Sequence, residues 1–131
     1  EATVPKITIT LRKSYGGSHI VMGCKQLRAD LNFAWPSSEI AVMGASGAVA
    51  VLCGKEAKAK KEAGEDVKAF LAEKEQEYTD KFANPYQAAQ YGYIDDVIEP
   101  RNTRFRICRG LAQLATKRQS LPAKKHGCMP M

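Results

Sequence analysis

The segment VPKITITLRKSYGGS, residues 4–18, decides the fold class of this chain. Apolar residues alternate with threonines over residues 4–11, which is the two-residue period of a half-buried strand. The run RKSYGG at residues 12–17 then ends in a glycine pair, which predicts a tight turn or a close backbone approach. A helix with one apolar face, carrying Ile20, Val21, Cys24 and Leu27, is expected over residues 18–29.

Strand and helix signals alternate along the rest of the chain. Short strands are expected at residues 31–35, 39–43 and 93–98. Helices are expected at residues 48–53, 85–91 and 100–117, with a long charged helix near 55–83 that a break at Gly64 would divide. The pattern predicts a single α/β domain with a core at 1–118 and an extended tail at 119–131.

Length and composition exclude several classes of protein. The chain has 131 residues, 44% of them apolar and 26% charged, which suits one ordinary domain and excludes wholesale disorder. The longest uncharged apolar run, residues 40–53, is too short to span a bilayer, and no basic-then-apolar leader is present. We therefore expect a soluble, cytoplasmic protein. Because the first residue is Glu, we expect that the chain was processed or cut from something longer.

The net charge of +6 is concentrated at one end of the chain. Residues 100–131 carry eight basic residues and no acidic one, whereas residues 1–99 carry 12 basic and 14 acidic residues. Such an end can meet phosphates, an acidic partner or an acidic patch on another subunit. The alternative is a solvated helix face with a basic end.

The cysteines do not form a metal or disulfide pattern. Cys24, Cys53, Cys108 and Cys128 lack CxxC spacing, and only Cys128 lies near a histidine, His126. We expect reduced thiols, as in a cytosolic protein, and no structural metal.

The glycine pair marks the candidate site. A strand, Gly16-Gly17-Ser18 and a helix start together direct free backbone N–H groups at one point, where they bind anions or developing oxyanions. Plain turn chemistry is the alternative. His19 is a candidate acid or base, but the sequence shows no partner for it. Asp95 and Asp96 point to opposite faces of a strand and cannot easily share a site, so we expect Asp95 or Asp96 to be a structural hydrogen-bonding group or an ion-pair partner.

Several strings, in this order, resemble one known family. They are VPKIT (4–8), RKSYGG (12–17), AWP (34–36), EIAVMGA (39–45), FANPY (82–86), GYIDDVIEP (92–100) and KKHG (124–127). The chain resembles the C-terminal part of the carboxyltransferase subunit of biotin-dependent acyl-CoA carboxylases, a group that includes propionyl-CoA carboxylase β chains and methylmalonyl-CoA decarboxylase α chains. The resemblance covers residues 1–131.

The resemblance implies a fold, a reaction and a set of partners. The fold is the last part of the second of two crotonase-like (ClpP/crotonase) domains, a partial β-β-α superhelix. The reaction transfers a carboxyl group between carboxybiotin and a short acyl-CoA such as propionyl-CoA or methylmalonyl-CoA. The implied partners are a biotin carboxyl carrier domain, biotin carboxylase or membrane decarboxylase subunits, and further copies of the parent subunit.

The resemblance also assigns roles at the helix start. It places the oxyanion hole for the ureido oxygen of biotin at the backbone N–H groups of Gly17 and Ser18, and substrate binding at Gly16, His19 and Ile20. Ser18 and His19 stand where Ala and Tyr are usual, which leaves the backbone donors intact. Propionyl-CoA carboxylases often carry Asp at the position of Ile20, which faces the acyl pocket.

Two other functions remain as alternatives. The chain can be a non-catalytic assembly module that uses its basic helix and tail for subunit contacts. Nucleic-acid binding through the basic helix is disfavoured, because Phe105 alone makes no aromatic ladder and no recognised motif is present.

Overall fold

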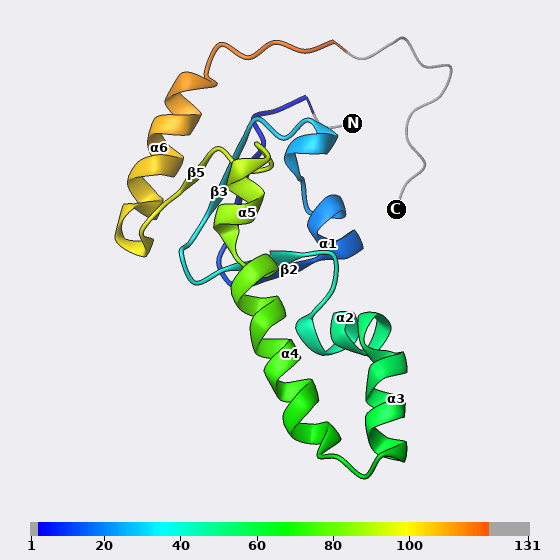
Figure 1. The fold of residues 1–131 in the computed structure, drawn as a ribbon. Helices are drawn as coiled ribbons and strands as arrows, with labels where there is room; N and C mark the ends of the chain where they lie inside the picture. The colour runs from blue at the N-terminus through cyan, green and yellow to red at the C-terminus, as the bar shows by residue number, and fades with distance from the viewer. Residues whose placement is uncertain (1–2, 121–131) are drawn as a thin grey trace, which may run out of the picture.

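The computed structural model describes residues 3–120 (Figure 1). Five short strands form two parallel sheets. The first sheet has the order β1-β3-β5, and the second pairs β2 with β4. The strands are β1 (Ile7–Thr10), β2 (Lys13–Tyr15), β3 (Leu31–Ala34), β4 (Glu39–Ala41) and β5 (Asp96–Val97).

Helices connect and cover these strands, because parallel strands require crossover connections. The α-helices are α1 (Gly16–Val21), α2 (Ala45–Leu52), α3 (Gly54–Glu62), α4 (Val67–Phe82), α5 (Pro85–Gln90) and α6 (Thr103–Gln113). Two 3₁₀ turns, η1 (Lys25–Leu27) and η2 (Pro100–Asn102), complete the order. The α/β class predicted from the sequence is confirmed.

The core lies where α5 meets the strands. Ala34 of β3, Ile40 of β4, Ala88 of α5 and Ile94 form one buried cluster. The register pairs Phe33 of β3 with Ile9 on one side and Asp96 on the other. The core of residues 3–120 thus joins a strand from each of the two narrow sheets to α5.

The C-terminal helix α6 packs closely against the three-stranded sheet. A Cβ atom at Gly110 would lie 2.7 Å from Leu31 Cδ1 and 3.1 Å from Ile7 Cδ1, so glycine permits the close approach. Beyond the helix, Lys117 Nζ donates to an Asp30 carboxylate oxygen at 2.8 Å and to the carbonyl of Val4 at 3.0 Å. These bonds join the end of the described chain to its beginning.

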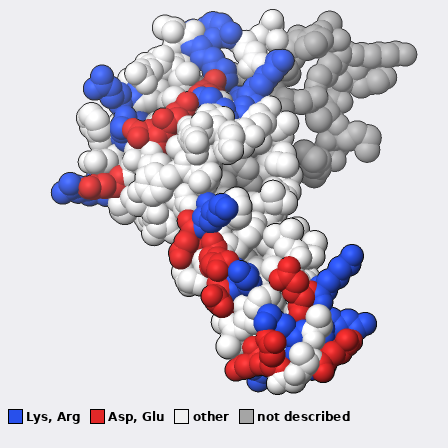
Figure 2. All heavy atoms as spheres, viewed as in Figure 1, with Lys and Arg blue, Asp and Glu red and all other residues white. Residues whose placement is uncertain are grey.

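The charged segment after α2 forms a helical hairpin that projects away from the sheets (Figure 1). Gly64 adopts a φ of +75° and ends the first arm, which confirms the break expected there. Asp66 caps α4 by accepting hydrogen bonds from the backbone N–H groups of Lys68 and Ala69 at 3.0 and 3.2 Å. Basic and acidic side chains, which are Lys, Asp and Glu in this segment, gather at the far end of the hairpin (Figure 2).

The structure differs from the sequence expectation around the glycine pair. Lys13–Tyr15 is a second strand, β2, rather than only a turn. The helix expected over residues 18–29 ends at Val21, because Gly23 has a φ of +96°. On its expected apolar face only Cys24 is buried, while 80% of Val21 is exposed.

Some expectations fall wholly or partly outside the described residues. His126, Cys128 and most of the expected extended tail lie beyond residue 120. Within residues 3–120, no helix is both long enough and apolar enough to cross a membrane.

Candidate functional site

The candidate site begins where β2 turns into α1. Tyr15 is extended at the cap position, and Gly16 follows with a φ of +48°. A Cβ at Gly16 would lie 2.8 Å from the carbonyl oxygen of Val42, so this position requires glycine for both conformation and space. A Cβ at Gly17 would meet nothing within 4 Å. The two glycines therefore have different roles: Gly16 shapes the turn, and Gly17 leaves open space at the helix start.

Backbone N–H groups at this helix start are free to bind an acceptor. The first N–H groups of a helix have no carbonyl partner within it. Tyr15 provides no side-chain cap, and the Ser18 hydroxyl instead donates to the carbonyl of Tyr15 at 2.6 Å. Gly17 and Ser18 are both exposed. Their N–H groups can therefore reach an oxyanion that approaches from solvent or from a neighbouring chain.

An apolar hollow of about 670 Å³ lies beside α1. Gly16, His19 and Ile20 form one wall of it. Its aromatic wall comes from α4, with Tyr78 and Phe82, and from the segment after α5, with Tyr91 and Tyr93. The structure thus brings the three predicted substrate-binding residues together in one hollow. The two predicted oxyanion donors, Gly17 and Ser18, are their neighbours in the chain but do not line the hollow.

His19 has a partner that the sequence did not indicate. The Ser14 hydroxyl of β2 lies 2.9 Å from Nδ1 of His19. Burial lowers the pKa of His19 below its usual value of 6.5, so the imidazole is neutral at neutral pH. The spacing of five residues matches no motif, and only the turn from strand to helix brings the two side chains together.

A second hydrogen bond joins the strand pair next to the site. The Tyr15 hydroxyl donates to the Glu39 carboxylate, linking β2 to β4. Burial, with the hydrogen bond and charge of Glu39, raises the pKa of Tyr15 to about 12. Tyr15 therefore stays protonated at neutral pH and supports the turn.

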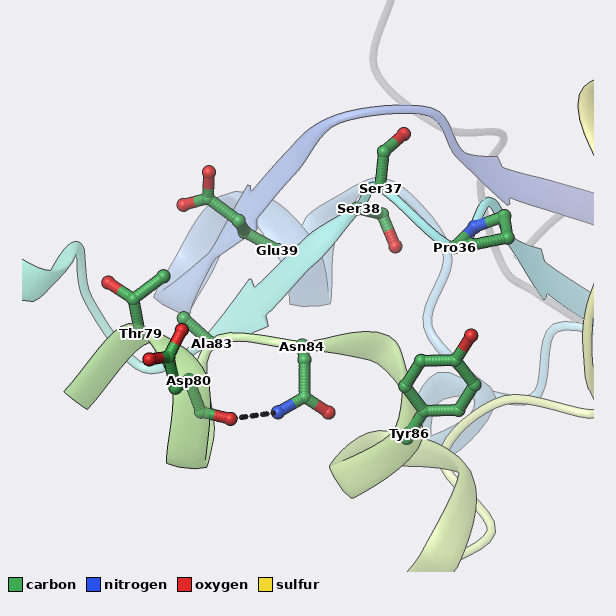
Figure 3. A pocket seen from close by; sticks show the side chains of 9 residues that line it. All are labelled: Pro36, Ser37, Ser38, Glu39, Thr79, Asp80, Ala83, Asn84 and Tyr86. Atoms are coloured by element: carbon green, nitrogen blue, oxygen red, sulfur yellow. Dashed lines mark hydrogen bonds between the residues drawn. The ribbon is translucent and has the colours of Figure 1, made fainter. Parts of the chain in front are cut away.

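A second hollow, of about 630 Å³, opens between the start of β4 and the junction of α4 and α5 (Figure 3). Ser38 lines it, and its buried hydroxyl has no hydrogen-bond partner. Asn84 caps α5 by accepting from the backbone N–H of Gln87 at 3.0 Å, and its amide donates to the carbonyl of Asp80 at 3.1 Å. None of the predicted site residues lies here.

The two adjacent aspartates act separately, as expected. Asp95 accepts from Lys25 Nζ at 2.6 Å and from the backbone N–H of Asn32 at 2.8 Å. Asp96 pairs with Arg106 of α6. Both are structural hydrogen-bonding groups, and residues 3–120 contain no cluster of three or more side chains suited to a metal ion.

Comparison with known proteins places this domain in the carboxyltransferase class. The profile of the carboxyl transferase domain family matches residues 1–129, so the chain belongs to the carboxyl transferase family. It is 53% identical over 131 residues to the propionyl-CoA carboxylase beta chain of Saccharopolyspora erythraea, covering 100% of this chain and 24% of that protein. It is 55% identical over 130 residues to the methylmalonyl-CoA carboxyltransferase 12S subunit of Propionibacterium freudenreichii subsp. shermanii, covering 99% of this chain and 24% of that protein.

A solved structure gives the same result. A crystal structure of transcarboxylase 12S, 54% identical, superposes with a TM-score of 0.85 over 99% of this chain and 24% of that chain. That protein is described as a hexamer, with methylmalonyl-CoA and methylmalonic acid bound. The resemblance stated from the sequence motifs is confirmed. The chain spans about a quarter of the length of these relatives.

Proposed function

We propose that the full-length protein transfers a carboxyl group between carboxybiotin and a short acyl-CoA, and that residues 3–120 form the biotin side of its site. The supporting observation is similarity over essentially the whole chain to a propionyl-CoA carboxylase beta chain and a methylmalonyl-CoA carboxyltransferase subunit. A third relative, 51% identical, is the methylmalonyl-CoA decarboxylase subunit alpha of Propionigenium modestum. The acyl-CoA class in the proposal comes from these relatives.

The backbone donors at α1 suit the chemistry of this reaction. Biotin, delivered on a partner carrier protein, supplies or takes the carboxyl group when it is bound. Release of the carboxyl group as CO2 would leave negative charge on the ureido oxygen of biotin. The N–H groups of Gly17 and Ser18 stabilise that charge, because they are fixed by the backbone and need no reorganisation. A single donor of this kind is worth roughly 3–4 kcal/mol in the transition state. The open space at Gly17 and the absence of a side-chain cap fit an oxyanion at this position.

The apolar hollow provides the rest of the proposed site. Gly16, His19 and Ile20 line one wall and are assigned to substrate binding. Ile20 presents an apolar side chain to the hollow, which suits a short acyl chain. The biotin carrier, biotin carboxylase or membrane decarboxylase subunits, and further copies of the same subunit are the proposed partners. The proposed compartment is the cytoplasm, where Cys24, Cys53 and Cys108, which form no disulfide here, stay reduced.

The alternative is an assembly role without catalysis. It is favoured by large apolar side chains exposed at the end of α1 and on α2: Val21, the last residue of α1, is 80% exposed, Met22 just after it 75%, and Val51 of α2 75%. Such surfaces mark contact with other protein. The two proposals differ in whether the helix start binds biotin.

The test compares the full-length protein with the 131-residue chain. Each purified protein is incubated with carboxyl-labelled methylmalonyl-CoA and free biotin, and label on biotin is counted. The full-length protein should transfer label, and the 131-residue chain should not, since it spans about a quarter of the relatives' length. Transfer by the 131-residue chain alone, or none by the full-length protein, would overturn the proposal as stated.

A further inference from the structure

The Ser14–His19 pair has no role in the proposed function beyond the assignment of His19 to substrate binding. Ser14 lies on β2 and His19 on α1, so the pair spans the turn that holds the backbone donors. The two side chains meet at 2.9 Å between Ser14 Oγ and His19 Nδ1. Both residues are half-buried. The contact therefore fixes the imidazole next to Gly17 and Ser18.

The contact leaves one ring nitrogen of His19 for the hollow. Nδ1 is engaged by Ser14, while His19 also lines the hollow beside α1. Nε2 is thus the nitrogen available to an occupant of the hollow. The Ser14 hydroxyl can donate to Nδ1 or accept from it, depending on the imidazole tautomer. Donation by Ser14 is the arrangement that places the ring proton on Nε2.

The surroundings keep the imidazole neutral. Burial is the cause that lowers the pKa of His19. The titratable groups that share the hollow with it are Tyr78 of α4, and Tyr91 and Tyr93 from the segment after α5. No Lys, Arg, Asp or Glu side chain lines the hollow. A neutral imidazole with a fixed tautomer can donate from Nε2 without first losing or gaining a proton.

We propose that Ser14 is a positioning residue for His19. Its hydroxyl donates to Nδ1 of His19, and this hydrogen bond directs Nε2–H of the same ring toward an acceptor oxygen of the bound carboxybiotin. His19 then supplies a side-chain donor beside the backbone N–H groups of Gly17 and Ser18. This inference rests on the proposed function, because it names the ligand of the same site. It adds a residue, Ser14, and a tautomer to that site.

The test is a double-mutant cycle in the full-length protein, with transfer of label from methylmalonyl-CoA to biotin as the activity. Ser14→Ala should lower kcat/KM about tenfold, the effect of losing one hydrogen bond. Ser14→Thr keeps the hydroxyl and a residue suited to a strand, so it should restore most of the activity. In a His19→Gln background, Ser14→Ala should cause no further loss, since Ser14 acts through His19. Ser37→Ala, at an exposed serine that lines the other hollow, is the matched control and should match wild type.

The pH profile separates positioning from a merely structural role. As pH falls through the lowered pKa of His19, Nδ1 gains a proton and stops accepting from Ser14, while Nε2–H remains a donor on a ring that now carries charge. Activity should therefore change through that pKa, on the acid limb of the profile. Ser14→Ala removes a hydrogen bond to the neutral ring and admits water, so the pKa of His19, followed by NMR in the full-length protein without biotin, should rise. The acid limb of the activity profile should move to higher pH with it.

The possible results separate the role of Ser14 from the proposed carboxyltransferase function. Additive losses in the double variant, or a Ser14→Ala variant with wild-type activity and an unmoved acid limb, would overturn the positioning role while leaving the carboxyltransferase proposal intact. If Ser14→Ala fails to fold, a Ser14→Thr variant that folds with tenfold lower activity would overturn it equally. Absence of transfer by the wild-type full-length protein would overturn the proposed function and this inference with it.

Discussion

Substitutions at the two adjacent glycines should have opposite effects on stability and on activity. Gly16 and Gly17 are neighbours in sequence, but only Gly16 has a positive φ, +48°. An alanine at Gly16 would carry its Cβ 2.8 Å from the carbonyl oxygen of Val42, whereas a Cβ at Gly17 would meet no atom within 4 Å. The pair is therefore a test in which each variant controls for the other.

The expected stability changes follow from the backbone. Left-handed backbone at a residue with a Cβ costs about 1–3 kcal/mol, and the contact with Val42 adds to it, so Gly16→Ala should lower the free energy of unfolding by about 2–4 kcal/mol. Gly17→Val places a residue of slightly better helix propensity than glycine in open space. Its free energy of unfolding should stay within about 0.5 kcal/mol of wild type.

The expected activity changes run the other way at Gly17. The valine side chain occupies the space through which an oxyanion reaches the N–H groups of Gly17 and Ser18. Losing one such donor lowers kcat by about 10²–10³-fold, so Gly17→Val in the full-length protein should lose at least that much. Urea unfolding followed by circular dichroism gives the stability, and label transfer to biotin gives the activity. A Gly17→Val protein that folds normally and transfers at a near-normal rate would refute the assignment of the backbone donors.

Three further predictions concern packing, pH and selectivity. Gly110→Ala should lower the free energy of unfolding by about 1–3 kcal/mol, because its Cβ would press on Leu31 and Ile7. Gly54→Ala, whose Cβ would meet nothing within 4 Å, is the control and should leave it unchanged. Equal urea midpoints for the two variants would contradict the packing of α6. The hydrogen bond from Lys117, together with that from the backbone N–H of Lys6, lowers the pKa of Asp30. The ionised Asp30 side chain therefore adds its full share to the free energy of unfolding above pH 3.8, and this share is lost as pH falls through the lowered pKa. Lys117→Met should cost about 1–3 kcal/mol at pH 7 and flatten that acid dependence, and an unchanged pH profile of unfolding would count against the pair. Ile20→Asp in the full-length protein should change the ratios of kcat/KM among acetyl-, propionyl- and butyryl-CoA by an amount equivalent to about 1–3 kcal/mol, without abolishing activity toward any of them. Unchanged ratios would show that Ile20 does not shape the acyl pocket.

Local patterns predicted most of the elements around the site. The alternation over residues 7–10 indicated β1, and the glycine pair indicated a strand-to-helix turn, because both signals depend on near neighbours. Gly64 and Asn84-Pro85 marked helix limits for the same reason. The family resemblance came from long motifs spread along the whole chain, and the similarity to known carboxyltransferases confirmed it.

The features that were missed depend on tertiary contacts. The early end of α1 is set by Gly23, which lies against β1. Its carbonyl accepts from the Thr8 hydroxyl at 2.8 Å, and a Cβ added at Gly23 would lie 3.0 Å from the oxygen of that hydroxyl. Ser14 and His19 meet only because a strand and a helix join at a sharp turn. The aromatic wall of the hollow comes from residues about sixty positions further along the chain, and no local period reports such a distance.

The proposed roles of the site residues rest on one geometric claim. That claim is that the backbone N–H groups of Gly17 and Ser18 hold the ureido oxygen of biotin. The most direct measurement is a structure of the full-length protein with biotin bound. The account predicts the ureido oxygen at hydrogen-bond distance, about 2.7–3.2 Å, from both backbone nitrogens. Biotin bound elsewhere, or with its ureido oxygen held only by side chains, would contradict it.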